Sequence, residues 1–221
     1  MSRMAAPHLV IFDCDGVLVD SERISHQVLI DLLAERGRRI GFDEAVATFM
    51  GSSMQRTLEL VESMVQVPPE AFLPAFRTRS FEAFTSSLEP VAGVPQLLAA
   101  LDTPFCVASN GPHEKMRLTL SRTGLIHHFV GRMFSADDVP NPKPAPDLFL
   151  LAASRMAVEP ARCVVVEDSP TGVRAARAAG MAVIGFAAMT PAGRLLEAGA
   201  QQVFDRMQDL PALLGSGGHG A

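Results

Sequence analysis

The chain has 221 residues, 48% hydrophobic content and a formal net charge of −5. A chain of this length can bury one hydrophobic core, or one core and a small second domain. The acidic balance argues against nucleic acid and anionic membranes as partners, because both attract basic surfaces. No apolar run reaches the roughly 18 residues that suggest a membrane span. The short apolar stretch near the N-terminus contains Asp13 and Asp15, unlike a signal peptide, and we therefore expect a cytoplasmic protein.

The first predicted strand is His8–Phe12, and a helical region follows it. From Ser21 to Ser87, apolar residues recur at the spacing that is typical of amphipathic helices. The predicted helices are Ser21–Arg36, Phe42–Met50, Met54–Val65 and Pro69–Ser87. Glycines and adjacent prolines separate them. We interpret residues 21–87 as an all-helical subdomain inserted after the first strand.

The rest of the chain alternates apolar strands with helices. The further predicted strands are Phe105–Ala108, Arg162–Val166, Met181–Phe186 and Gln201–Phe204, and the helices between them are Pro112–Thr123, Pro146–Met156 and Ser169–Ala179. Strands that are apolar throughout are typical of sheets covered on both faces. The alternation predicts an α/β fold with a doubly wound, mainly parallel sheet, formed by residues 1–20 and 88–221. The Gly-rich tail Gly215–Ala221 is predicted to be disordered.

The cysteines Cys14, Cys106 and Cys163 lie in or beside predicted strands. Their spacing matches neither a disulfide framework nor a metal-ligand motif. Free cysteine is among the most frequently buried residue types. We therefore predict that these side chains are reduced and lie in the core.

Two carboxylates follow the first strand. Asp13 and Asp15 are two residues apart, so they project on the same side of an extended chain. They lie where ligands bind in open α/β sheets, and Gly16 permits a tight turn after them. Close carboxylates repel one another unless a cation offsets the repulsion, which favours Mg²⁺. A carboxylate can also attack phosphorus. The alternative interpretation is a plain Asp-Gly turn.

Two further segments offer groups that bind anions. Ser109 provides a hydroxyl, and Asn110 and Gly111 provide backbone N–H groups just before a predicted helix. An ordinary helix N-cap is the alternative interpretation of this segment. Lys143 stands between prolines, and the restricted backbone suits a cation that binds a phosphoryl oxygen. A solvated loop lysine is the alternative there.

Glu167 and Asp168 end the predicted strand Arg162–Val166 immediately before a helix. Either acid could serve only as a helix cap or as a partner of the helix dipole. The carboxyl ends of parallel strands meet at one edge of a sheet, so these acids can also complete a metal site with Asp13 and Asp15. The sequence thus predicts acids, a hydroxyl and a lysine together at one sheet edge.

In order and spacing, these segments resemble the haloacid dehalogenase-like hydrolase superfamily, in its subgroup with a helical cap after the first strand. The segments that carry the resemblance are Asp13–Glu22, Ser109–Gly111, Lys143–Asp147 and Glu167–Asp168. The resemblance covers nearly the whole chain. It implies a Rossmann-like core and a cap, residues 21–87, that closes over the substrate and excludes water.

The resemblance also implies roles for individual residues. Asp13 is the expected nucleophile, and Asp15 is the expected general acid and base. The expected cofactor is Mg²⁺, held by Asp13, by the backbone carbonyl of Asp15 and by Asp168. Glu167 is expected to reach the metal directly or through water.

The phosphoryl group is expected to bind Ser109 and Lys143, with further backbone donors from Asn110 and Gly111. True dehalogenases of this family lack an acid followed by glycine at the position of Asp15, and they need no metal. An acid there can protonate a leaving alkoxide. The resemblance therefore implies a Mg²⁺-dependent phosphatase, a phosphoric monoester hydrolase that forms an aspartyl-phosphate.

Two alternatives remain at this point. A β-phosphoglucomutase-like phosphosugar mutase carries a cap histidine and arginine at positions that correspond here to Ser25 and Met54. His26 and Arg56 are offset by one and two residues, and one residue turns a helix by about 100°, which counts against a mutase. The second alternative is a non-catalytic ligand-binding protein on the same fold.

The segment Ser109–Met116 resembles bacterial sugar-phosphate phosphatases of this subgroup. We therefore expect a small phosphorylated metabolite, a sugar phosphate, as the substrate. The candidate substrate contacts are His26, Gln55, Arg56 and Lys115. Charged residues are mostly solvated at the surface, which is the alternative for each of them. We expect a monomer or a weak homodimer.

Overall fold

The computed structural model describes residues 6–50, 52 and 54–215. The chain divides into two compact units, of which the smaller is Asp20–Glu89 and the larger comprises the segments on either side of it. Of the tail predicted to be disordered, Gly215–Ala221, only Gly215 lies within the described residues. No described helix is long and apolar enough to cross a membrane.

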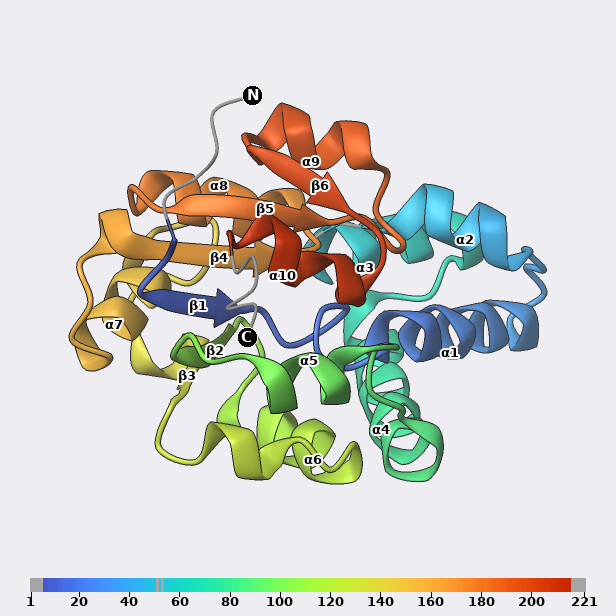
Figure 1. Ribbon diagram of the computed structural model, residues 1–221. Coiled ribbons are helices and arrows are strands. Elements are labelled where there is room, and N and C mark those ends of the chain that lie inside the picture. Colours follow the sequence, from blue (N-terminus) through green and yellow to red (C-terminus); the bar gives the residue numbers. More distant parts are fainter. Residues whose placement is uncertain (1–5, 51, 53, 216–221) are drawn as a thin grey trace. The chain divides into compact units, whose positions relative to one another are not determined.

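The larger unit is built on a six-stranded sheet in which all neighbouring strands are parallel (Figure 1). The strands are β1 (Leu9–Phe12), β2 (Phe105–Ser109), β3 (Met133–Ser135), β4 (Cys163–Glu167), β5 (Ala182–Phe186) and β6 (Gln202–Phe204). Their order, β3-β2-β1-β4-β5-β6, is that of a doubly wound Rossmann-like sheet. The predicted fold class is confirmed, and β1 lies centrally between β2 and β4.

The helices of the larger unit are α5 (Val94–Ala100), α6 (His113–Arg122), α7 (Asp147–Arg155), α8 (Pro170–Ala178), α9 (Ala192–Ala198) and α10 (Leu210–Leu213). Short 3₁₀ turns are η1 (Ile126–Phe129), η2 (Ala136–Asp138), η3 (Pro160–Arg162) and η4 (Met207–Asp209). Helices α7, α8 and α9 bury apolar side chains against one face of the sheet, which includes Leu9, Ile11 and Val165. The three cysteines are free and buried, as predicted.

Several elements of the larger unit were not predicted from the sequence, among them β3, α5 and α9. The strand β3 has only three residues, too few for a periodic pattern. Pro95 lies in the first turn of α5, and the Gly93-Val94-Pro95 sequence is more typical of a turn. Helix α9 has seven residues and includes Gly193, which lowers its helix propensity.

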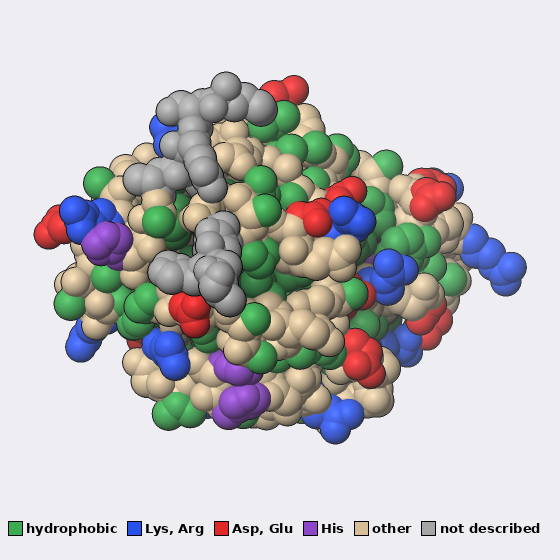
Figure 2. Space-filling model, viewed as in Figure 1, with side chains coloured by type: hydrophobic (Ala, Val, Ile, Leu, Met, Phe, Trp, Pro, Cys, Tyr) green, Lys and Arg blue, Asp and Glu red, His purple; other side chains and the backbone are tan. Residues whose placement is uncertain are grey.

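Among its described residues, the smaller unit contains helices and no strand. Its helices are α1 (Ser21–Glu35), α2 (Phe42–Phe49), α3 (Met54–Val65) and α4 (Pro69–Ser87). They share an apolar core that includes Leu32, Leu33, Val61 and Phe72. On the face drawn in Figure 2, acidic and basic side chains of the described residues are interspersed rather than gathered by sign.

Candidate active site

Polar side chains gather at the carboxyl ends of the three central strands. Asp13 directly follows β1, Ser109 is the last residue of β2, and Glu167 is the last residue of β4. Asp168 comes next in the chain and precedes α8. Since neighbouring parallel strands end at one edge, the sheet itself brings these side chains together, at the edge where α/β folds bind ligands.

The chain turns sharply after Asp13. Gly16 has a φ of +76°, in the left-handed region that favours glycine, and its N–H donates to the carbonyl of Val19. The turn leaves Asp15 beside α6, where its carboxylate lies 2.8 Å from the ammonium of Lys115. Cys14 lies against α6 as well, with its Sγ 3.9 Å from the Thr119 hydroxyl.

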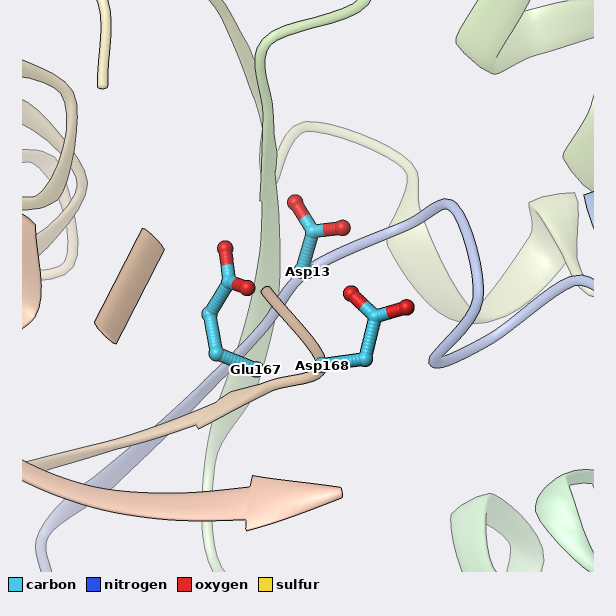
Figure 3. Close-up of side chains that lie close together, drawn as sticks. All are labelled: Asp13, Glu167 and Asp168. Carbon is cyan, nitrogen blue, oxygen red and sulfur yellow. The ribbon is translucent and has the colours of Figure 1, made fainter. Parts of the chain in front are cut away.

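Asp13, Glu167 and Asp168 form a compact acidic cluster (Figure 3). Each is buried, and each offers a carboxylate oxygen within 4.8 Å of the others. Burial raises the pKa of Asp13 to about 7; Glu167 and Asp15 act in the same direction, and Lys143 opposes them. Hard oxygen donors and unrelieved negative charge fit a divalent cation such as Mg²⁺. The residues present therefore fit the expected metal.

Lys143 is the buried cation of this site. Its ammonium donates to Asp13 at 2.6 Å, to Glu167 at 2.8 Å and to the carbonyl of Ala108 at 2.8 Å. An ammonium has three N–H groups, so these acceptors use all of them. The ammonium also lies 4.6 Å from the centre of the Phe149 ring. Burial alone would lower the pKa of Lys143, but the two carboxylates outweigh it and raise that pKa, so the side chain stays charged.

Asn110 holds the backbone of Lys143 by two hydrogen bonds. Its side-chain amide donates to the carbonyl of Lys143 at 3.1 Å and accepts the N–H of Lys143 at 3.0 Å. From the sequence, Asn110 was expected to contribute its backbone N–H to an anion. The structure adds a role for its side chain, as the group that fixes the segment carrying Lys143.

The backbone of Gly111 is hydrogen-bonded to two serine side chains. Its N–H donates to the hydroxyl oxygen of Ser109 at 3.0 Å. The Ser109 side chain is thereby oriented, and its own O–H remains to donate. The carbonyl of Gly111 accepts a hydrogen bond from the Ser135 hydroxyl at 2.8 Å, which ties the segment to the end of β3.

Glu167 is fixed by residues that the sequence analysis did not single out. Its second oxygen accepts hydrogen bonds from the N–H and the hydroxyl of Ser169, both at 2.9 Å. A Cβ at Gly172 would overlap the Glu167 carboxylate, so only glycine leaves room for it. The one sequence signal for this contact was Gly172 itself, because glycine in the first turn of α8 has a lower helix propensity than most other residues.

The remaining candidate contacts lie apart from this cluster in the chain. His26 is buried in the smaller unit, and its Nδ1 lies 2.8 Å from the backbone carbonyl of Glu22. Gln55 and Arg56 are exposed on α3, and both contact Glu59 on the same helix. Lys115, by contrast, belongs to the larger unit and joins the site through Asp15.

Comparison with known proteins agrees with this geometry. Residues 7–180 match the family model described as haloacid dehalogenase-like hydrolase. The chain is 33% identical to 6-phosphogluconate phosphatase of Escherichia coli K12, covering 96% of each chain. It is 32% identical to fructose-1-phosphate phosphatase of the same organism, covering 78% of this chain and 92% of that one.

A solved structure shows the same architecture. A haloacid dehalogenase-like protein of unknown function from Agrobacterium tumefaciens C58 superimposes with a TM-score of 0.88 at 40% identity. The match covers 95% of this chain and 98% of that one. By sequence and by fold, the chain belongs to the haloacid dehalogenase-like hydrolase family.

Proposed function

We propose that this protein, a phosphoric monoester hydrolase, releases phosphate from a small phosphorylated sugar metabolite in a Mg²⁺-dependent reaction with an aspartyl-phosphate intermediate. The observation that carries the proposal is the placement of Asp13. Its carboxylate lies between the buried ammonium of Lys143 and two further acids, at the carboxyl edge of the sheet. A second acid, Asp15, follows two residues later on a tight turn.

Asp13 is the nucleophile in the proposed reaction. One of its oxygens attacks phosphorus, and the bond between phosphorus and the ester oxygen breaks. Asp15 donates a proton to the departing oxygen and then takes a proton from the water that hydrolyses the aspartyl-phosphate. Lys143 supplies fixed positive charge beside the attacking carboxylate, and the Ser109 O–H donates to a phosphoryl oxygen.

The acidic cluster holds the metal in this proposal. Asp13 and Asp168 provide carboxylate oxygens, and both are buried at the strand ends. The carboxylate oxygens of Glu167 accept hydrogen bonds from Lys143 and Ser169. In this proposal Glu167 therefore positions the neighbouring groups and is not a primary ligand of the metal. When bound, Mg²⁺ supplies positive charge that offsets the phosphoryl oxygens and the carboxylates.

The sugar phosphate class rests on the comparisons. The two Escherichia coli relatives are named for 6-phosphogluconate and fructose 1-phosphate, both phosphorylated sugar derivatives. Their similarity extends over most of this chain.

The proposal is tested by phosphate release from a panel of phosphorylated metabolites, with Mg²⁺ or with a chelator. The panel contains 6-phosphogluconate, fructose 1-phosphate, hexose and pentose phosphates, phosphoglycolate and β-glucose 1-phosphate. Asp13→Asn protein runs in parallel. The matched control is Asp102→Asn, which changes an exposed acid near the opposite end of β2.

We expect Mg²⁺-dependent release that Asp13→Asn abolishes and Asp102→Asn leaves intact. No release from any compound would overturn the proposal. Isomerised sugar phosphates without net release would indicate the mutase instead. Release that persists in Asp13→Asn would exclude the aspartyl-phosphate.

A further inference from the structure

Two lysines lie at the site, and they serve different carboxylates. Lys143 is buried and contacts Asp13 and Glu167, on the side where phosphorus is attacked. Lys115 comes from the first turn of α6 and contacts Asp15, the acid that serves the leaving oxygen. The Lys115 side chain is 34% exposed, against 3% for Lys143. Lys115 can therefore contact a substrate group that enters from solvent, whereas Lys143 would first have to lose a buried contact.

We propose that Lys115 binds a carboxylate on the leaving group, and that the substrates of this enzyme are phosphorylated sugar acids rather than neutral sugar phosphates. The inference rests on the proposed function and names the substrate class of the same site. A general acid must lie within hydrogen-bond reach of the oxygen that it protonates. An ammonium 2.8 Å from the Asp15 carboxylate therefore lies beside the departing part of the substrate.

Gly111 lies close to Lys115, Asp15 and Ser109. A Cβ at Gly111 would lie 3.5 Å from Cδ of Lys115, 3.7 Å from Oδ2 of Asp15 and 3.3 Å from Oγ of Ser109. The side chains of Lys115, Asp15 and Ser109 thus lie close to one another around Gly111. Lys115 belongs to a helix of ten residues, which fixes the position of its backbone.

The charge at the site explains why a lysine is needed there. Asp13, Glu167 and Asp168 place three buried carboxylates at the reaction centre, and Asp15 adds a fourth acid, which carries a proton until the leaving oxygen takes it. A second negative group on the substrate is repelled by them unless a cation meets it. Lys143 directs all three N–H groups to protein acceptors and has none for the leaving group. Lys115 is a cation beside Asp15, the acid that serves the leaving group.

The test compares two substrates that differ in one group. In 6-phosphogluconate, C1 is a carboxylate; in glucitol 6-phosphate, the same carbon is a neutral CH₂OH. We expect wild-type kcat/KM to favour the acid by about tenfold or more, the range that a single charged contact can provide. Lys115→Met should bring the ratio close to one, and Lys115→Arg should keep most of it.

The control is Arg117→Met, which removes one positive charge from an exposed position of the same helix. It should leave the substrate ratio unchanged, which separates a local contact from the general field of the protein. Thermal unfolding of each variant verifies the fold. Because the readout is a ratio within one protein, a merely structural loss of activity does not alter it.

Binding provides a readout that does not depend on turnover. In Asp13→Asn protein with Mg²⁺, calorimetry should show tighter binding of 6-phosphogluconate than of glucitol 6-phosphate, and added Lys115→Met should remove the difference. Equal binding, or an equal loss of kcat/KM for both compounds in Lys115→Met, would overturn the proposal. If the wild type hydrolyses nothing, the proposed function fails, and the binding preference still decides whether Lys115 recognises the carboxylate.

Discussion

Two sets of candidate site residues, one in each unit, lie in contrasting surroundings. In the larger unit, Lys143, Asp13 and Glu167 are buried and bond to one another. In the smaller unit, Gln55 and Arg56 are exposed, and each contacts Glu59 about one helical turn along α3. A buried charge requires partners, whereas an exposed one is satisfied by water. Substitutions at the strand ends should therefore affect folding and catalysis together, and substitutions on α3 should separate them.

The largest effect is expected from Lys143→Met. The change leaves the carboxylates of Asp13 and Glu167 buried without their cation, which costs about 3–5 kcal/mol of unfolding free energy. We also expect kcat to fall by about a thousandfold, since fixed charge at the reaction centre is lost. Chemical denaturation and phosphate release measure the two effects.

A Lys143→Met protein with unchanged stability would show that the three groups are not coupled in the fold. Asp13→Asn combined with Lys143→Met sharpens this outcome. Because the double variant has lost both charges of one contact, its destabilisation should be less than the sum of the single changes.

Gly172→Ala should have the next largest effect. The added methyl group would overlap the Glu167 carboxylate, so the acid or the start of α8 must move. We expect a loss of about 1–3 kcal/mol of unfolding free energy from overpacking, and a fall in kcat of about tenfold to a hundredfold because Lys143 loses a fixed partner.

Gly193→Ala is the matched control for this substitution. Gly193 lies in α9, and nothing is within 4 Å of an added Cβ there. Alanine should leave activity intact and raise stability by about 0.5–1 kcal/mol, since glycine is the poorer helix former. Equal behaviour of the two variants would mean that Glu167 readily finds another position.

Features that depend on residues close together in the chain could be predicted from the sequence more readily than contacts between distant residues. Apolar runs such as those of β1 and β4 predict their strands, because a strand covered on both faces has few polar positions. The gathering of Asp13, Glu167 and Asp168 follows from parallel pairing alone. The edge strand β3 escapes prediction, since three residues carry no period.

The contacts around Lys143 could not be predicted in the same way. The partners of its ammonium lie 24, 35 and 130 residues away in the chain. The clamp from Asn110 spans 33 residues and depends on the side chain rather than the backbone. Such contacts arise where a loop packs against strand ends that are distant in the chain, and no local propensity encodes them.

Asn110→Ala should have a moderate effect. It removes both hydrogen bonds to the Lys143 backbone while leaving every charged group in place. We expect about 1–2 kcal/mol of destabilisation and a fall in kcat of about tenfold, with KM little changed because no substrate contact is lost. Asn141→Ala, at an exposed pair with Asp147 on the same loop, should alter neither value. A rise in KM alone would assign the Asn110 side chain to the substrate.

The smallest effect on folding is expected from Arg56→Ala. Its ion pair with Glu59 is exposed at both ends, with side chains 58% and 48% accessible, so the melting temperature should shift by less than about 2 °C. If Arg56, a candidate contact from the sequence, does bind the substrate, KM should rise several-fold while kcat stays constant. Arg38→Ala, which breaks the exposed pair with Glu44 in the same unit, should change neither quantity.

An unaltered KM in Arg56→Ala would remove this arginine from the substrate site and leave it as a solvated side chain. The expected change is in substrate binding and not in folding. Arg56→Ala therefore complements Lys143→Met, which is expected to change both stability and kcat.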